Sequence, residues 1–304
     1  MKSFIGKIIL FACIILVIDI ALGFCFRHLV SHAIGGDTRR LEYICRQTHE
    51  NLLIFGSSRC VHHYDTNILE DSLQLTAYNC GKNGNGIILL YGWYSMINKR
   101  YQPKAIIYDV MPNYDLLQTD NMTYLPGLRY YYDEPGIDSI FWTVAPNERY
   151  KMMLQSYRYN SQCLQIIMDN IKPMRKDEKG YRPLTGSMTY EPQILSTKED
   201  VTYQYDPLKL YYLERLIKDC QAAHTQLIFM ASPLYRETND AALTPIKELC
   251  RRYDLPFISH YTDSTFNNNR SYFKDSGHMN QKGATAYTQA IIQELRHILA
   301  QGGK

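Results

Sequence analysis

Short apolar runs alternate with amphipathic segments along much of the chain. Five runs have the length and bulk of buried strands, at residues 52–55, 75–78, 105–110, 226–231 and 255–259. Helical spacing or a helix-start signal marks the segments at about 87–99, after Asp206-Pro207, between Thr244-Pro245 and Arg252, and after Asn280. This alternation predicts a parallel sheet covered by helices on both faces. Such sheets carry their sites at the carboxyl ends of the strands.

The N-terminal pattern is different. Ile8 to Phe26 is apolar except for Asp19, and a helix of that length would extend about 28 Å, close to the thickness of a bilayer core. The segment is longer than the apolar region of a secretory signal and favours a retained anchor, although Ala21-Leu22-Gly23 leaves a cleaved signal as the alternative. Asp19 is costly inside a membrane, so we expect it to reach the interface or to meet a partner. We expect a flank at 1–7, a transmembrane anchor at 8–26 and a stalk at 27–49, with the remainder outside the cytoplasm.

A segment rich in tyrosine interrupts the alternation from about residue 116 to 205. One helix is expected over Tyr150–Ile171. The segment has no strand pattern of its own, so we interpret it as a mostly helical insertion or lid within a single domain at 50–301.

Composition narrows the range of partners. The formal net charge is +3 and 21% of residues are charged, without the basic stripe that nucleic-acid binding requires. The 26 tyrosines suit half-buried surfaces or a sugar-stacking cleft. The 8 cysteines lack metal-site spacing, so neither a metal nor a cofactor is expected. Cys60–Cys80 and Cys220–Cys250 are candidate disulfides, and buried thiols are the alternative.

Two separated motifs carry candidate chemistry. Ser58 follows the first strand in Gly56-Ser57-Ser58, and Asp275-Ser-Gly-His278 precedes the last helix. In an Asp-x-x-His loop the carboxylate can orient the imidazole, whose other nitrogen can take the proton of an attacking serine. The two motifs together predict a triad of Ser58, His278 and Asp275.

Acyl transfer also needs donors for the developing oxyanion. The candidates are the N–H groups of Ser58 and Gly81 and the side chain of Asn113. Asn79 shapes the turn before Gly81 and is a candidate for substrate binding. Arg59 either binds an anionic group of the substrate or anchors its loop through a buried carboxylate.

These motifs resemble the SGNH (GDSL-type) hydrolase superfamily. Gly56-Ser57-Ser58 stands where that family has Gly-Asp-Ser, Asn79-Cys80-Gly81 with Gly84 fits its glycine motif, and Asp275–His278 fits its closing Asp-x-x-His. The likeness covers residues of about 50–115 and 225–300. Ser57 replaces the usual aspartate, Arg59 follows as in membrane-anchored relatives, and the third motif lacks its Gly-x-Asn-Asp.

The resemblance implies a flavodoxin-like three-layer α/β/α sandwich with five parallel strands. It also implies a serine esterase, lipase or O-acyltransferase that works without a metal. For an anchored chain we expect an acyl-enzyme mechanism on acylated, foremost acetylated, cell-envelope glycans or on a small ester, with an envelope acyl-transfer protein as a possible partner. The alternative is a non-catalytic accessory subunit of an envelope polysaccharide modification system. The sequence leaves the acyl group, the acceptor and the oligomeric state open.

Overall fold

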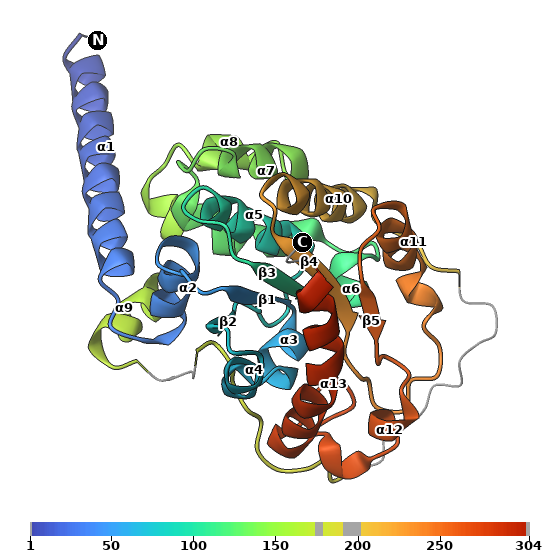
Figure 1. Ribbon diagram of the computed structural model, residues 1–304. Coiled ribbons are helices and arrows are strands. Elements are labelled where there is room, and N and C mark those ends of the chain that lie inside the picture. Colours follow the sequence, from blue (N-terminus) through green and yellow to red (C-terminus); the bar gives the residue numbers. More distant parts are fainter. Residues whose placement is uncertain (1, 174–178, 191–201, 302–304) are drawn as a thin grey trace. The chain divides into compact units, whose positions relative to one another are not determined.

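The computed structural model describes residues 2–173, 179–190 and 202–301 (Figure 1). The chain divides into two compact units. One consists of Met1–Gln47 with Asn121–Lys176, and the other of Thr48–Asp120 with Asp177–Lys304. We refer to them as the helical unit and the sheet unit.

The sheet unit contains a sheet of five strands in the order β2-β1-β3-β4-β5, and every pair is parallel. This is the strand order of flavodoxin-like folds. The α/β class predicted from the sequence is therefore confirmed. The strands are β1 (Leu52–Gly56), β2 (Ala77–Asn79), β3 (Ala105–Asp109), β4 (Gln226–Ala231) and β5 (Phe257–Ser259).

Helices cover both faces of this sheet (Figure 1). Helices α5 and α10 lie against one face, and α3, α4 and α13 against the other. The helices of the sheet unit are α3 (Ser58–His63), α4 (Thr66–Leu73), α5 (Ile87–Asn98), α6 (Pro112–Asp115), α10 (Pro207–Ala222), η3 (Ala241–Leu243), α11 (Thr244–Arg252), α12 (Ser264–Asn267), η4 (Arg270–Tyr272) and α13 (Gln281–Gln301).

The central strands are mostly apolar, as expected of strands covered on both faces, and Asp109 at the end of β3 is the charged exception. Ile54, Ile107 and Ile228 belong to the core on the α13 side, together with Tyr287 and Ile291 of that helix. Two predicted caps also hold. Asp206 accepts from the backbone N–H groups at the start of α10, and Asn280 accepts from the N–H of Gly283 in α13 at 3.0 Å.

The helical unit contains no strand among its described residues. Its helices are α1 (Lys2–Ser31), α2 (Gly36–Arg46), η1 (Asn121–Tyr131), α7 (Ile137–Val144), α8 (Glu148–Lys151), η2 (Ser156–Tyr159) and α9 (Cys163–Ile171). Within the described part of the chain, α1 is the one helix long and apolar enough to cross a membrane. An anchor and a signal sequence both fit that helix.

One expectation from the sequence needs correction. The single helix expected over Tyr150–Ile171 is instead α8, η2 and α9 with turns between them. Of the two alternatives for Cys60–Cys80 and Cys220–Cys250, the structure has the buried thiols, and all four of these cysteines are free. The domain boundaries that we expected stay a prediction, and residues 174–178 and 191–201 of the expected insertion lie outside the described residues.

Candidate active site

Ser58 lies at the sharp turn between β1 and α3. Gly56 ends the strand with a φ of 149°, and a Cβ there would come within 2.7 Å of both the Asp109 carbonyl oxygen and the Cys60 Cβ. Because a larger residue would clash with this backbone, glycine lets the chain turn directly from strand to helix. Ser58 is the first residue of α3, and only 8% of it is exposed.

His278 connects Ser58 with Asp275. The Nε2 atom of His278 is 2.7 Å from Ser58 Oγ, and its Nδ1 atom is 2.9 Å from Asp275 Oδ1. In the tautomer that carries its proton on Nδ1, the ring donates to the carboxylate and accepts from the serine hydroxyl. Three side chains that are contributed by the beginning and the end of the sheet unit's sequence thus meet in the order that general-base catalysis requires. Their catalytic roles stay a prediction.

The Asp275 carboxylate also shapes its own loop. Asp275 Oδ1 accepts from the backbone N–H of Gly277 at 2.8 Å and from that of His278 at 2.9 Å. The Lys274 N–H returns to the His278 carbonyl at 2.9 Å. One carboxylate oxygen therefore sets both the backbone turn and the orientation of the imidazole.

His62 packs edge-on against the His278 ring, with centroids 5.6 Å apart. Its Nδ1 is 2.6 Å from the carbonyl oxygen of Arg182, which can only accept, so this nitrogen carries the proton. Burial lowers the pKa of His62 below the ordinary histidine value. The neutral His62 ring thus packs against the His278 imidazole and restricts its movement.

A second, fully buried histidine holds the backbone beside His278. His63 Nε2 accepts from the Met279 N–H at 2.9 Å, and His63 Nδ1 is 3.0 Å from Ser232 Oγ. Ser232 Oγ in turn donates to Asp109 Oδ2 at 3.1 Å. Burial, reinforced by the nearby Arg59 charge, holds the pKa of His63 well below its usual range, so the ring is neutral near pH 7.

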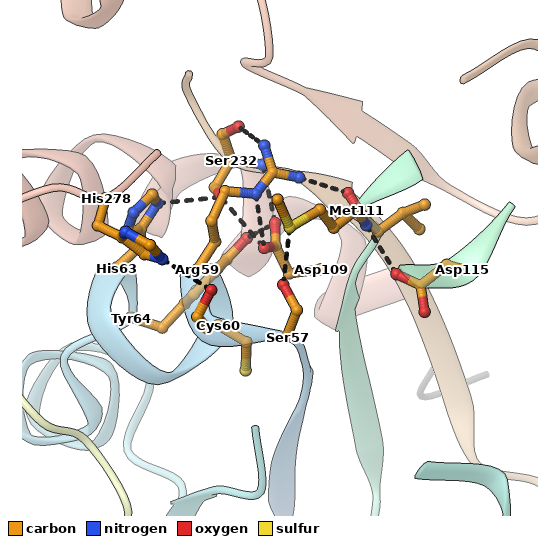
Figure 2. A network of polar contacts seen from close by, with 12 residues as sticks. Ser57, Arg59, Cys60, His63, Tyr64, Asp109, Met111, Asp115, Ser232 and His278 are labelled. Carbon is orange, nitrogen blue, oxygen red and sulfur yellow. Dashed lines mark hydrogen bonds and ion pairs between the residues drawn. The ribbon is translucent and has the colours of Figure 1, made fainter. Parts of the chain in front are cut away.

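Asp109 is the centre of this buried network (Figure 2). It ends β3 and accepts from the Tyr64 hydroxyl and the Ser232 N–H, each at 2.8 Å. Burial raises the pKa of Asp109 despite these donors and the Arg59 charge. The network joins the ends of β3 and β4 to the turn that carries Ser58.

Arg59 lies inside the protein, not in a substrate cleft. Its side chain is 0% exposed, and it donates to the Val110 carbonyl at 2.7 Å and the Ser232 carbonyl at 3.2 Å. Its Nε is 3.9 Å from Asp109 Oδ2. Of the two roles expected from the sequence, the anchor through a buried carboxylate fits this arrangement, and we withdraw the candidate role in substrate binding.

Asn79 is also enclosed, so its candidate role in substrate binding is withdrawn for the same reason. Its Nδ2 donates to the Cys60 carbonyl at 2.7 Å, and its Oδ1 accepts from the Gly81 N–H at 3.0 Å. The Gly81 amide therefore already has a protein acceptor in this structure. A Cβ on Gly81 would lie 2.8 Å from Cys60 Sγ, which explains the glycine by packing alone.

Asn113 lies on α6, the turn that follows β3, with its side chain exposed. Asp115 holds this turn by accepting from the Met111 N–H at 2.7 Å, and Lys209 Nζ donates to the Asn113 carbonyl at 3.1 Å. Burial raises the pKa of Asp115 to about 6. The turn is rigidly held, and the participation of the Asn113 amide in an oxyanion hole stays a prediction.

The sequence analysis missed two residues that support the site from within, Asp109 and Ser232. A signal for both was available. Asp109 is the one charged residue of the third apolar run, next to its end, and Ser232 directly follows the fourth. Polar residues at the carboxyl ends of neighbouring parallel strands meet at one edge of the sheet. Among the described residues, no group of three or more His, Cys, Asp or Glu side chains is arranged to hold a metal ion.

Comparison with known proteins adds little to this site. No family model matches the chain, and no curated protein matches it. Among solved structures, the chain is similar to one described as a "putative platelet activating factor from Streptococcus pneumonia". The two share 13% identity at a TM-score of 0.41, over 95% of this chain and 99% of that chain. A likeness this distant says nothing about the reaction.

Proposed function

We propose that this protein is a serine esterase or O-acyltransferase of the SGNH type. The observation that carries the proposal is the 2.7 Å contact between Ser58 Oγ and His278 Nε2, backed by the 2.9 Å contact between His278 Nδ1 and Asp275. A serine hydroxyl is a weak nucleophile until a neighbouring base takes its proton. This arrangement supplies the base and the carboxylate that orients it.

The reaction has two halves. Ser58 Oγ attacks the carbonyl carbon of an ester while its proton passes to His278 Nε2, and Asp275 stabilises the imidazolium that forms. The ester C–O bond then breaks, and His278 returns the proton to the departing alcohol oxygen. In the second half, water or a sugar hydroxyl attacks the acyl-enzyme and gives its proton to His278. Ser58 is released with its hydroxyl restored.

We assign the Ser58 N–H and the Asn113 side chain as hydrogen-bond donors to the oxyanion. The Gly81 N–H is a third donor, provided that its hydrogen bond to Asn79 Oδ1 is broken or shared with the oxyanion. Each such donor is worth about 3 kcal/mol of barrier in other serine hydrolases. The proposed substrates are acylated, foremost acetylated, glycans of the cell envelope. The proposed location is outside the cytoplasm, with α1 as a membrane anchor.

A fluorophosphonate probe tests the nucleophile directly, because it phosphonylates only an activated serine. We expect labelling of the wild type and none of Ser58→Ala. Ser57→Ala is the matched control, since Ser57 Oγ contacts only the Met111 sulfur, at 3.2 Å, among the hydrogen bonds described for it. Failure of the folded wild type to react, or equal labelling of Ser58→Ala, would end the proposal.

The second candidate function is a non-catalytic accessory subunit of an envelope polysaccharide modification system. It is favoured by the Gly81 N–H, which is committed to Asn79. Acyl-ester profiling of envelope polysaccharide separates the two functions. An accessory subunit keeps its effect on acylation in Ser58→Ala, whereas the enzyme loses it.

A further inference from the structure

Asp19 lies within the apolar run of α1, yet it is well satisfied by groups of the same unit. It is 6% exposed. Its carboxylate accepts from the Gln155 N–H at 2.8 Å, from the Ser156 N–H at 3.0 Å and from the Ser156 hydroxyl at 2.5 Å. A charge that is expensive in an apolar helix is thus stabilised by a turn more than 130 residues away.

Gly23, one turn further along α1, brings the same segment against the helix. A Cβ at Gly23 would lie 2.3 Å from the Cβ of Gln155, a distance that no packing tolerates. The hydrogen bonds to Asp19 and this close approach fix the position of Gln155 and Ser156 along the axis of α1, between Asp19 and Gly23. Both contacts lie on one face of the helix, where Val30 also packs against Tyr159 and Ile166.

The position of this turn along α1 bears on how the helix can cross a membrane, because the part of α1 that no other segment covers is short. Every residue from Lys2 to Ile18 is exposed, and the apolar part of this stretch begins at Ile8. Ile8–Ile18 rises only about 16 Å as a helix, whereas the hydrocarbon core is about 30 Å thick. If α1 crosses the bilayer along Ile8–Phe26, the hydrocarbon must extend to the level of Asp19 and beyond. The turn bound to Asp19 then lies inside it.

Two side chains of that turn and a stripe on α9, nearer the carboxyl end of α1, are apolar and exposed. Met153 and Leu154, which directly precede Gln155, are 75% and 50% exposed. Helix α9 packs on α1 through Ile166 and exposes Leu164, Ile167 and Ile171 at helical spacing. In water these side chains would form an unusual apolar surface, whereas against lipid tails they are in their preferred environment.

We propose that the turn Met153–Ser156 enters the bilayer beside α1, in the leaflet nearest the carboxyl end of that helix, and that the exposed stripe of α9, which packs at the level of Leu29 and Val30, lies at the surface of the same leaflet. The partner is the hydrocarbon of the membrane. The protein would then hold the membrane by a helix and a re-entrant turn joined through Asp19. This inference rests on the anchoring role proposed for α1 and is independent of the chemistry at Ser58.

Depth-dependent fluorescence quenching tests the location. The full chain carrying Trp142→Phe, which keeps the buried Trp93 as a constant background, is reconstituted into vesicles of brominated phosphatidylcholine. Tryptophan is then introduced singly at Met153 or Leu154, at Leu16 of α1, or at Tyr211, an exposed position on α10. We expect strong quenching of the probes at 153, 154 and 16 and none at 211.

The different probe positions distinguish a wrong placement of the turn from a wrong assignment of α1 as a membrane anchor. Quenching at Leu16 without quenching at 153 and 154 would overturn the re-entrant turn and leave the anchor intact. Absence of quenching at all positions would overturn both. If the apolar surface instead binds a second copy of the chain, the probes at 153 and 154 stay unquenched in vesicles that contain dimers, which also contradicts the proposal.

A matched pair of glycine variants tests the link through α1. Gly23→Ala drives a methyl group into Gln155, whereas Gly6→Ala meets nothing within 4 Å. We expect Gly23→Ala to reduce quenching of the Leu154→Trp probe while the Leu16→Trp probe is unaffected, and Gly6→Ala to change neither. Equal quenching of the Leu154→Trp probe in both glycine variants would show that contact with α1 does not set its depth.

Discussion

The backbone N–H of Met279 donates to Nε2 of His63 across 2.9 Å. This bond joins the loop that carries His278 to a side chain that is 0% exposed and belongs to the same short helix as Ser58. The proposed base and the proposed nucleophile are therefore held in register by a second histidine inside the protein. His63 is a positioning residue in this arrangement, because the atoms it contacts are not the reacting ones.

Replacing His63 tests this positioning role. His63→Phe leaves the Met279 N–H without its acceptor, and an unsatisfied buried donor costs about 1–3 kcal/mol. We expect the loop that carries His278 to lose its register with Ser58 and kcat with p-nitrophenyl acetate to fall by about tenfold or more while KM changes little, because even small misplacement of a catalytic group lowers the rate. His63→Gln keeps both a donor and an acceptor, so it should recover most of kcat. Equal kcat losses in the two variants would argue against positioning by this hydrogen bond.

The stability of the fold should depend on pH through the same histidine. The folded state holds the pKa of His63 well below its usual range, while the unfolded chain binds a proton near pH 6.5. Below that pH the unfolded state therefore binds more protons than the folded state. The contribution of His63 to the free energy of unfolding is complete above about pH 6.5. It is lost as the pH drops, by at most about 1.4 kcal/mol per pH unit. Urea unfolding between pH 7.5 and 5 measures the slope.

His63→Gln should flatten that acid-side slope, whereas the control His297→Gln, at an exposed position of α13, should keep it. Parallel slopes for wild type and His63→Gln would mean that another group causes the loss of stability.

Replacement of Asp275 should lower the rate of catalysis far more than replacement of an ordinary loop carboxylate. Asp275→Asn keeps the size of the side chain but can donate to His278 Nδ1, which favours the tautomer that cannot accept the Ser58 proton. The equivalent change in another serine hydrolase lowers kcat by about 10⁴-fold. We expect a loss of at least about 10³-fold in the rate of acyl-enzyme formation, measured by stopped flow. The exposed Asp254, which adopts a left-handed conformation that asparagine tolerates, provides the control Asp254→Asn. A loss below tenfold would remove Asp275 from the mechanism.

The buried pair of Arg59 and Asp109 should be more important for stability than for substrate affinity. Arg59→Met leaves the Asp109 carboxylate without its countercharge, and breaking a buried pair in this way costs about 3–5 kcal/mol. Arg59→Met combined with Asp109→Leu removes both charges and should regain part of that loss. The free energy of unfolding in urea is the measurement, with the surface variant Arg296→Met as control. A large rise in KM without loss of stability would restore Arg59 to the substrate site.

The sequence predicts the scaffold of the site well because its determinants are local. The end of β1, the cap at Asn280 and the Asp275–His278 loop each depend on residues within a few positions of one another. The buried network does not have this property. His63, Asp109 and Ser232 are separated by up to about 170 residues, and each alone reads as an ordinary loop or strand-end residue. Only the register of β1, β3 and β4 brings them together.

The broken helix of the insertion has a similar cause. The sequence from Tyr150 to Ile171 has helical spacing, but the N–H groups of Gln155 and Ser156 donate to Asp19 and not to carbonyls one turn earlier. A carboxylate from a distant helix thus overrides the local preference. The sequence predicts that Asp19 reaches the membrane interface or meets a partner, but nothing local in it indicates that the partner is the backbone of this segment.

Asn113 provides the most direct test of the proposed oxyanion hole. Its turn is held by Asp115 and Lys209, so an amide on it keeps its place while charge develops on the substrate oxygen, which is the condition for electrostatic stabilisation. Asn113→Ala should lower kcat for p-nitrophenyl acetate by about 10²-fold with KM little changed, because the donor acts mainly in the transition state. Asn83→Ala, another exposed asparagine after a strand, is the matched control. If both variants retain full kcat, the oxyanion must be held by backbone N–H groups alone, and the Gly81 amide would then have to leave Asn79 during the reaction.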